Sequence, residues 1–159
     1  MTYIFVDVDG VLNPDNLRPG GFTILAKPYG PGSAGYKLKL HKDYAKWLLE
    51  LQSCTGARLV WGTTWQQWAN EWVGVPLGLP EMPYLDLSPQ KYGENLGSIK
   101  GRQAVAYANG SPFVYFDDEP NIGYAINGSK GLHIAIDWHR GLEESHIEVA
   151  KEYLKSVNE

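Results

Sequence analysis

Two apolar segments of the chain, YIFVDVDG and FVYFDD, each end in a pair of acids. The acids are Asp7 and Asp9 in the first segment and Asp117 and Asp118 in the second. Aromatic and β-branched residues fill both segments, as is typical of buried strands. Residues two apart on a strand point to one face, so Asp7 and Asp9 would leave the sheet together. Their repulsion requires a compensating cation or a shared proton.

Helical and strand patterns alternate along the rest of the chain. Helices are expected over residues 42–56, 98–109 and 143–157, and strands over residues 57–61, 83–87 and 132–136. A further helix is expected where Trp65, Trp68, Ala69 and Trp72 recur on one face. This alternation, together with strands at residues 3–8 and 113–116, predicts an α/β fold with a parallel sheet covered on both faces.

The proline- and glycine-rich stretch of residues 14–36 has no helical period. We expect it to form a flap, with at best a short strand at residues 22–26. The 159 residues fit one domain, 1–159, with this flap as its insertion.

Charge and cysteine content restrict the function classes. A net charge of -4 leaves no general basic surface, which argues against tight electrostatic binding of long nucleic acid and leaves room only for a local basic rim. Cys54 is the single cysteine, so no intramolecular disulfide is expected. The sequence shows neither a signal peptide nor a membrane-spanning run, and we expect a soluble, cytoplasmic protein that does not associate with membranes.

Polar residues follow three of the expected strands, where ligands bind in open parallel sheets. They are Asp7 and Asp9, Thr63 and Thr64, and Asp117 and Asp118. So many carboxylates at one edge of the sheet need a divalent cation, and ligands that are all oxygen atoms suit Mg²⁺. Because Mg²⁺ commonly keeps substrate phosphate oxygens among its ligands, the expected partner is a phosphate group.

The order of DVDGVLN, a strand ending in WGTT, and a lysine before FDDEP resembles the haloacid dehalogenase (HAD) superfamily of aspartyl-phosphate phosphohydrolases. These motifs span nearly the whole chain. The sequence LVWGTTW, followed by AN and by VPLGLP, is similar to sequences of a capless branch of the superfamily, which includes HAD domains of RNA-repair proteins. The resemblance implies a three-layer Rossmann-like α/β fold. Neither gap between the motifs is long enough for a separate cap domain, so an open site is expected.

The resemblance also implies catalytic roles. Asp7 would be the nucleophile that forms an acyl phosphate, and Asp9 the general acid/base. Thr63 would hydrogen-bond a phosphoryl oxygen. The third-motif lysine would be Lys100, with Lys91 as the alternative, since only spacing separates them.

The metal ligands implied by the resemblance are Asp7, Asp117, Asp118 and a backbone carbonyl of Asp9, and which acid of the second pair binds Mg²⁺ directly stays open. Substrate contacts are expected from Gly10, where the chain leaves the strand sharply, and from Thr64 and Trp65 near the rim. They are also considered for three flap residues, Arg18, Lys27 and Tyr29.

Structural roles compete with these assignments. The acids could be solvated strand ends, Thr63 a helix N-cap, Lys100 a surface lysine, and most tryptophans core packing. The leading hypothesis is a Mg²⁺-dependent phosphomonoesterase whose phosphorylated substrate is a nucleotide, a nucleic-acid end or a small metabolite. The alternatives are a metal-dependent nuclease, in which water attacks, and a noncatalytic module that binds a phospho-ligand or a protein. The oligomeric state is left open.

Overall fold

A parallel four-stranded sheet forms the centre of the molecule in the computed structural model, which describes residues 1–158. Its strand order is β4 (Arg58–Trp61), β1 (Tyr3–Val6), β5 (Phe113–Asp117) and β6 (Gly131–Ala135). β1 pairs with β4 on one side and β5 on the other. The first acid pair therefore follows a central strand, and the second ends its neighbour.

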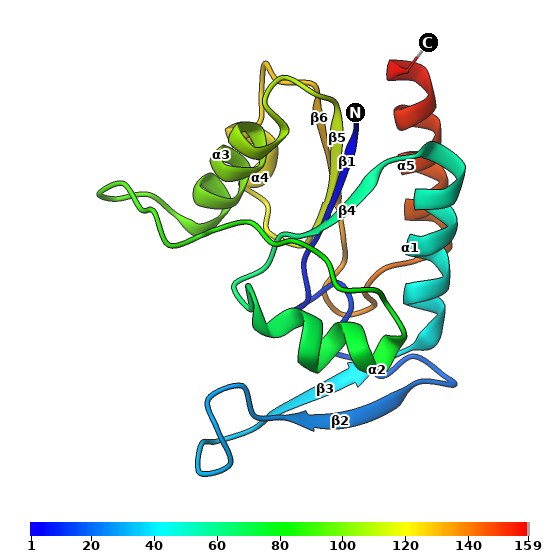
Figure 1. The fold of residues 1–159 in the computed structure, drawn as a ribbon, viewed down its shortest axis with the longest axis vertical. Helices are drawn as coiled ribbons and strands as arrows, with labels where there is room; N and C mark the ends of the chain where they lie inside the picture. Colours follow the sequence, from blue (N-terminus) through cyan, green and yellow to red (C-terminus); the bar gives the residue numbers. More distant parts are fainter. Residues whose placement is uncertain (159) are drawn as a thin grey trace.

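Helices cover both faces of this sheet (Figure 1). α1 (Lys42–Thr55) and α5 (Glu144–Val157) lie together on one face, and α3 (Leu96–Ala108) with the short α4 (Ile122–Ala125) lies on the other. Alternate strand residues enter the two cores: Ile4 and Val6 pack with the first layer, and Phe5 with the second. This confirms the predicted three-layer α/β fold with a central parallel sheet. No separate cap domain is evident in residues 1–158.

Most predicted elements lie within two residues of their expected bounds, and the inward residues of α5, Ile147, Ala150 and Leu154, are buried. One predicted strand, residues 83–87, is wrong: the segment makes only an isolated bridge beside Trp61, at Tyr84. Because the ring of Pro83 removes a backbone donor, the pairing does not extend in that direction.

The flap is a β-hairpin rather than mainly a loop. β2 (Phe22–Ala26) was expected, but it pairs antiparallel with a second strand, β3 (Tyr36–Leu40), which sequence analysis assigned to no element. The alternation of apolar residues with Lys37 and Lys39 was the missed strand signal. Leu38 and Leu40 are buried in the main core, and the hairpin lies beyond the ends of β1 and β5 (Figure 1).

The tryptophan-rich segment is not the regular helix that was predicted. It makes turns over residues 64–67, has helical geometry at Trp68 and Ala69, and continues as a five-residue π-helix, η1 (Asn70–Gly74), and one turn of helix, α2 (Val75–Leu77). Gln66 has φ 49°, which an α-helix excludes. The Asn70 side chain accepts hydrogen bonds from the Trp61 indole and the Met82 amide, both over about 3 Å, and so fixes the following loop.

Among residues 1–158, no helix has both the length and the apolar character needed to cross a membrane.

Candidate active site

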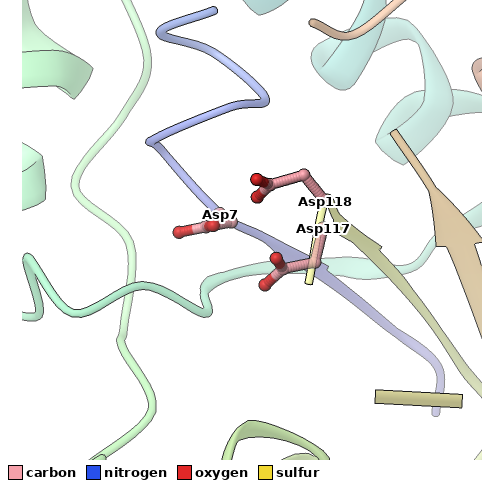
Figure 2. Close-up of side chains that lie close together, drawn as sticks. All are labelled: Asp7, Asp117 and Asp118. Carbon is pink, nitrogen blue, oxygen red and sulfur yellow. The ribbon is translucent and has the colours of Figure 1, made fainter. Parts of the chain in front are cut away.

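Three acids converge where β1 and β5 end. One carboxylate oxygen each from Asp7, Asp117 and Asp118 lies within 4.8 Å of the others. Figure 2 shows the three side chains at the ends of the two neighbouring strands, extending to the same side. Asp7 and Asp117 are buried, whereas Asp118 is partly exposed. The structure thus brings Asp7 together with the second acid pair, although Asp7 and Asp117 are 110 residues apart in sequence.

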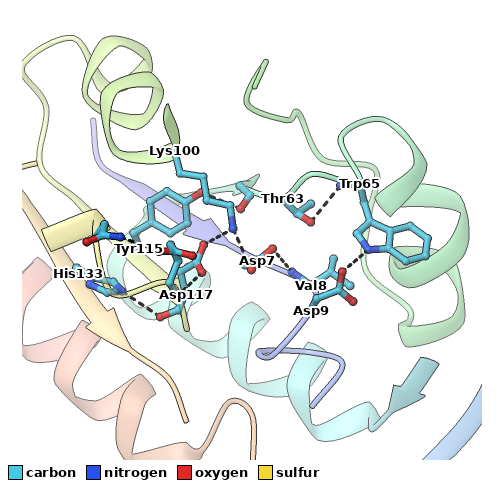
Figure 3. Close-up of polar contacts among 12 residues, drawn as sticks. Asp7, Val8, Asp9, Thr63, Trp65, Lys100, Tyr115, Asp117 and His133 are labelled. Carbon is cyan, nitrogen blue, oxygen red and sulfur yellow. Dashed lines mark hydrogen bonds and ion pairs between the residues drawn. The ribbon is translucent and has the colours of Figure 1, made fainter. Parts of the chain in front are cut away.

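A single buried lysine joins two of these acids (Figure 3). The Nζ atom of Lys100 lies 3.1 Å from Asp7 Oδ2 and 2.7 Å from Asp117 Oδ2. Lys100 is only 3% exposed. Lys91, the alternative, is exposed in the loop before α3, where its backbone amide bonds to Glu94. The structure therefore places Lys100, and not Lys91, between the acids.

Glycines on either side of Lys100 set its position. A Cβ atom on Gly97 would lie 2.7 Å from Asn121 Cβ, and one on Gly101 would lie 2.4 Å from Ala125 Cβ. Both positions need glycine because α3 packs closely against α4. This packing directs Lys100 into the sheet edge rather than into solvent.

The charges in this buried group do not balance. Burial raises the pKa of Asp117 to about 9, with a further contribution from Asp7, and Lys100 offsets only part of the rise. Burial likewise raises the pKa of Asp7 despite Lys100. For Lys100, burial favours the neutral amine, but the two acids outweigh it and hold the pKa above its ordinary value. With one cation for two acids, the group keeps either a proton or an additional cation.

The donor set fits a hard divalent cation. It consists of carboxylate oxygens from Asp7, Asp117 and Asp118, which suit Mg²⁺, and it carries excess negative charge. The carboxylate of Asp9 does not belong to this three-acid group. Its side chain accepts a hydrogen bond from Trp65 Nε1 at 3.0 Å (Figure 3). It accepts a second from Asn13 Nδ2, also at 3.0 Å. The metal role expected for Asp9 concerns its backbone carbonyl and stays a prediction.

Asn13 connects Asp9 to the hairpin. Its amide nitrogen donates to Asp9, while its Oδ1 accepts from the backbone amide of Lys39 in β3 at 2.8 Å. The turn between them begins at Val8, whose carbonyl accepts from three following amides. The hairpin is thereby fixed to the loop that carries Asp9.

Two features of the structure require glycine at position 10. Its φ of +81° lies in the left-handed region, and a Cβ atom there would sit 2.5 Å from Asp118 Cγ. The residue expected to contact substrate thus also lets the Asp118 carboxylate approach the turn after β1.

Thr63 is fully buried after β4, and its Oγ1 accepts a hydrogen bond from the Trp65 amide at 3.2 Å. The bond uses an oxygen lone pair, so the hydroxyl proton can still be donated, which is compatible with both roles considered for it. Thr64, which was expected to contact substrate, is exposed.

Sequence reasoning missed two residues that support the site. The buried Tyr115 donates to the Gly62 carbonyl at 2.7 Å and so holds the turn that carries Thr63. His133 Nε2 lies 3.0 Å from the backbone oxygen of Asp117. A tyrosine within the otherwise apolar run FVYF was the available signal, because a buried hydroxyl needs a partner.

Two pockets meet at Asp9. The first, here called the aromatic pocket, has a volume of about 100 Å³ and is lined, besides Asp9, by Pro28, Tyr29, Tyr36, Thr64, Trp65 and Trp68. The second, here called the lysine groove, includes Lys37, Lys39, Asp118 and Trp138. Because Tyr36 and Lys37 are neighbours on one strand and point to opposite faces, β3 contributes to both.

The three flap candidates have different locations. Tyr29 lines the aromatic pocket, as do the rim candidates Thr64 and Trp65. Arg18 instead lies over the rings of Tyr44 and Trp47 and donates to the Leu142 carbonyl at 2.6 Å, which is a structural role. Lys27 contacts the Pro31 carbonyl within the hairpin tip.

Comparison with known proteins agrees with this geometry. Residues 3–147 match the family described as HAD domain in Swiss Army Knife RNA repair proteins. A search of curated proteins found no match to the chain.

Proposed function

Because the chain belongs to the family of HAD domains in Swiss Army Knife RNA repair proteins, we propose that it is a Mg²⁺-dependent phosphatase that cleaves a phosphomonoester through an aspartyl phosphate. The family implies a function of the phosphohydrolase type. We further propose that the substrate is a nucleotide or a phosphorylated nucleic-acid end.

The observation that carries this proposal is Lys100 between Asp7 and Asp117, with Asp118 beside them. A nucleophilic carboxylate needs positive charge nearby to accept a phosphoryl group, and Lys100 supplies it at 3.1 Å. Asp7, Asp117, Asp118 and the Asp9 carbonyl would hold the Mg²⁺ ion. The bound ion would withdraw charge from the phosphoryl oxygens.

In the first proposed step an oxygen of Asp7 attacks phosphorus, and the bond from phosphorus to the ester oxygen breaks. Asp9 gives a proton to that oxygen, and the alcohol leaves. In the second step Asp9 takes a proton from water, which attacks phosphorus and releases inorganic phosphate and free Asp7. Lys100 and the Thr63 hydroxyl would hold the phosphoryl oxygens in both steps.

The test measures phosphate release with Mg²⁺ from an aryl phosphate, from mononucleotides, from sugar phosphates, and from oligonucleotides phosphorylated at either end. Release should be lost in Asp7→Asn and in chelator, but retained in Glu50→Gln, which changes an exposed acid on α1. With beryllium fluoride, a phosphoryl mimic should add to Asp7 in the parent protein and not in Asp7→Asn.

Two results would contradict the proposal. Cleavage of internal phosphodiesters without a trapped adduct at Asp7 would indicate a nuclease in which water attacks. Binding of phosphorylated ligands without turnover, unchanged in Asp7→Asn, would indicate a noncatalytic module.

A further inference from the structure

We infer that the aromatic pocket binds the nucleobase of the leaving group, so that the phosphate cleaved at Asp7 belongs to a nucleotide whose base stacks between the hairpin and the tryptophan-rich segment. This inference rests on the proposed function, because it assigns the leaving group of that reaction. The aromatic pocket is thus a binding site for a planar aromatic ring.

The position of Asp9 connects the pocket to the chemistry. In the proposed reaction Asp9 gives its proton to the ester oxygen, so the leaving group extends from the Asp9 carboxylate. Asp9 Oδ2 lies 3.0 Å from Trp65 Nε1, and both residues line the aromatic pocket. A leaving group whose ester oxygen takes its proton from Asp9 therefore has this pocket directly beside it.

The rings in the pocket are arranged to accept another ring. Tyr36 and Trp65 meet edge to face, with their centroids 5.4 Å apart. Tyr29 is 70% exposed and Tyr36 49% exposed, so their ring surfaces face solvent. Stacking a base on such side chains removes apolar surface of both partners from water and tolerates any base.

Charge favours this occupant over a second phosphate. The aromatic pocket contains one ionisable acid, Asp9, and no lysine or arginine among its lining residues. The lysines lie on the other side of Asp9, in the lysine groove. A neutral planar ring fits the first pocket, whereas an anionic group would meet Asp9 there without a compensating cation.

The pocket wall is held in place before any ligand binds. Tyr36 is two residues from the buried Leu38, and the backbone of Lys39 is bonded to Asn13. Because β3 is fixed to the core and to the Asp9 loop, binding a base does not require ordering the whole hairpin.

The kinetic test compares a nucleoside monophosphate with glycerol phosphate, which has no ring. In Tyr36→Ala, kcat/KM for the nucleotide should fall by about tenfold, mainly through KM, while the value for glycerol phosphate stays unchanged. Tyr36→Phe keeps the ring and should behave as the parent. Tyr92→Ala, a fully exposed tyrosine outside the pocket, is the matched control. Equal changes for both substrates, or none for either, would overturn the inference.

A binding test separates this inference from the proposed function. Calorimetry on the Asp7→Asn protein should show the nucleotide binding about tenfold more weakly once Tyr36→Ala is added. If the parent hydrolyses no phosphate ester but this difference is found, the proposed function fails and the pocket assignment stands. If esters are hydrolysed but Tyr36→Ala leaves nucleotide binding unchanged, the pocket assignment fails alone. Tyr29→Ser gives a second, independent removal of a ring.

Discussion

Helix α3 carries two cations two residues apart that lie in opposite environments. Lys100 is buried between Asp7 and Asp117, whereas Arg102 forms a partly exposed two-point pair with Glu94, at 2.7 and 2.9 Å. Both regions place an acid within hydrogen-bond distance of a cation. They differ in burial and in the ratio of charges.

The pKa values of the acids in these two regions shift in opposite directions. Hydrogen bonds from Arg102 lower the pKa of Glu94 to about 2. Burial raises the pKa of Asp117 to about 9, even though Lys100 is 2.7 Å away. In the one-to-one pair near water the two charges neutralise each other. One lysine cannot neutralise two buried acids. The second arrangement is suited to recruiting a metal ion, and the first to holding a loop.

The largest effect is expected from Lys100→Met. It leaves Asp7 buried without its cation, next to an Asp117 that keeps its proton up to about pH 9. This costs about 3–5 kcal/mol of unfolding free energy near neutral pH and removes phosphatase activity. The loss should shrink at low pH, where Asp7 is protonated as well. Denaturant unfolding and phosphate release measure both, and Lys91→Met is the control. A fully active Lys100→Met protein would break the comparison.

A smaller effect is expected from Gly10→Ala compared with Gly78→Ala. Both glycines have φ +81°, so both variants should lose about 1–2 kcal/mol of stability. Only at Gly10 does the added methyl group meet the Asp118 carboxylate. Mg²⁺ affinity, measured by calorimetry, should therefore fall in Gly10→Ala alone. Equal affinities would mean that Asp118 does not contribute to the metal site.

The two acids should give opposite pH dependences without metal. The folded state keeps a proton on Asp117 that the unfolded chain releases, so its contribution falls as pH rises from about 4 to about 9. Glu94 contributes above its ordinary pKa of 4.5, and this is lost as pH falls toward about 2.

Thermal unfolding scans across pH measure this dependence. Mg²⁺ must displace the proton, so it should raise the melting temperature more near pH 8 than near pH 6. A Mg²⁺ effect that does not vary with pH would argue against ion binding at these acids.

The smallest effect is expected from Arg102→Met. The pair with Glu94 is close to water, so activity and neutral-pH stability should hardly change. The acid-side loss of stability that comes from Glu94 should disappear, because the pKa of Glu94 returns toward its ordinary value and no longer differs between the folded and unfolded states. Acid titration followed by circular dichroism measures this change, and a large loss of activity would show that the loop before α3 takes part in the reaction.

The acid cluster was predictable because strand-end acids in a parallel sheet must share an edge, as Asp7 and Asp117 do. Lys100 was preferred over Lys91 only through the family resemblance, because spacing alone does not show which residues of α3 face the sheet. Asn95, which caps that helix, and the tight glycines at 97 and 101 decide it in the folded chain. The glycines could be seen in GSIKGR, but the sequence did not show that they pack against α4.

The aromatic pocket could not be predicted from sequence. It exists only because the hairpin packs over the site and because Gln66 interrupts the helix expected around Trp65 and Trp68. Helical spacing suggested that most of the tryptophans pack in the core, as Trp68 and Trp72 do, and Trp65 was the substrate candidate. Trp65 is itself buried. Its indole edge nonetheless reaches Asp9, and this depends on a backbone turn rather than on a periodic pattern.

The anchoring of β3 through Asn13 makes strand alignment a determinant of selectivity. With the bond from Lys39 to Asn13 in place, Tyr36 faces one side of Asp9 and Lys37 the other. A slip of one residue would exchange the aromatic ring for an ammonium group beside the acid. Changes in hairpin length could therefore retune which esters are accepted while the carboxylates beneath stay untouched.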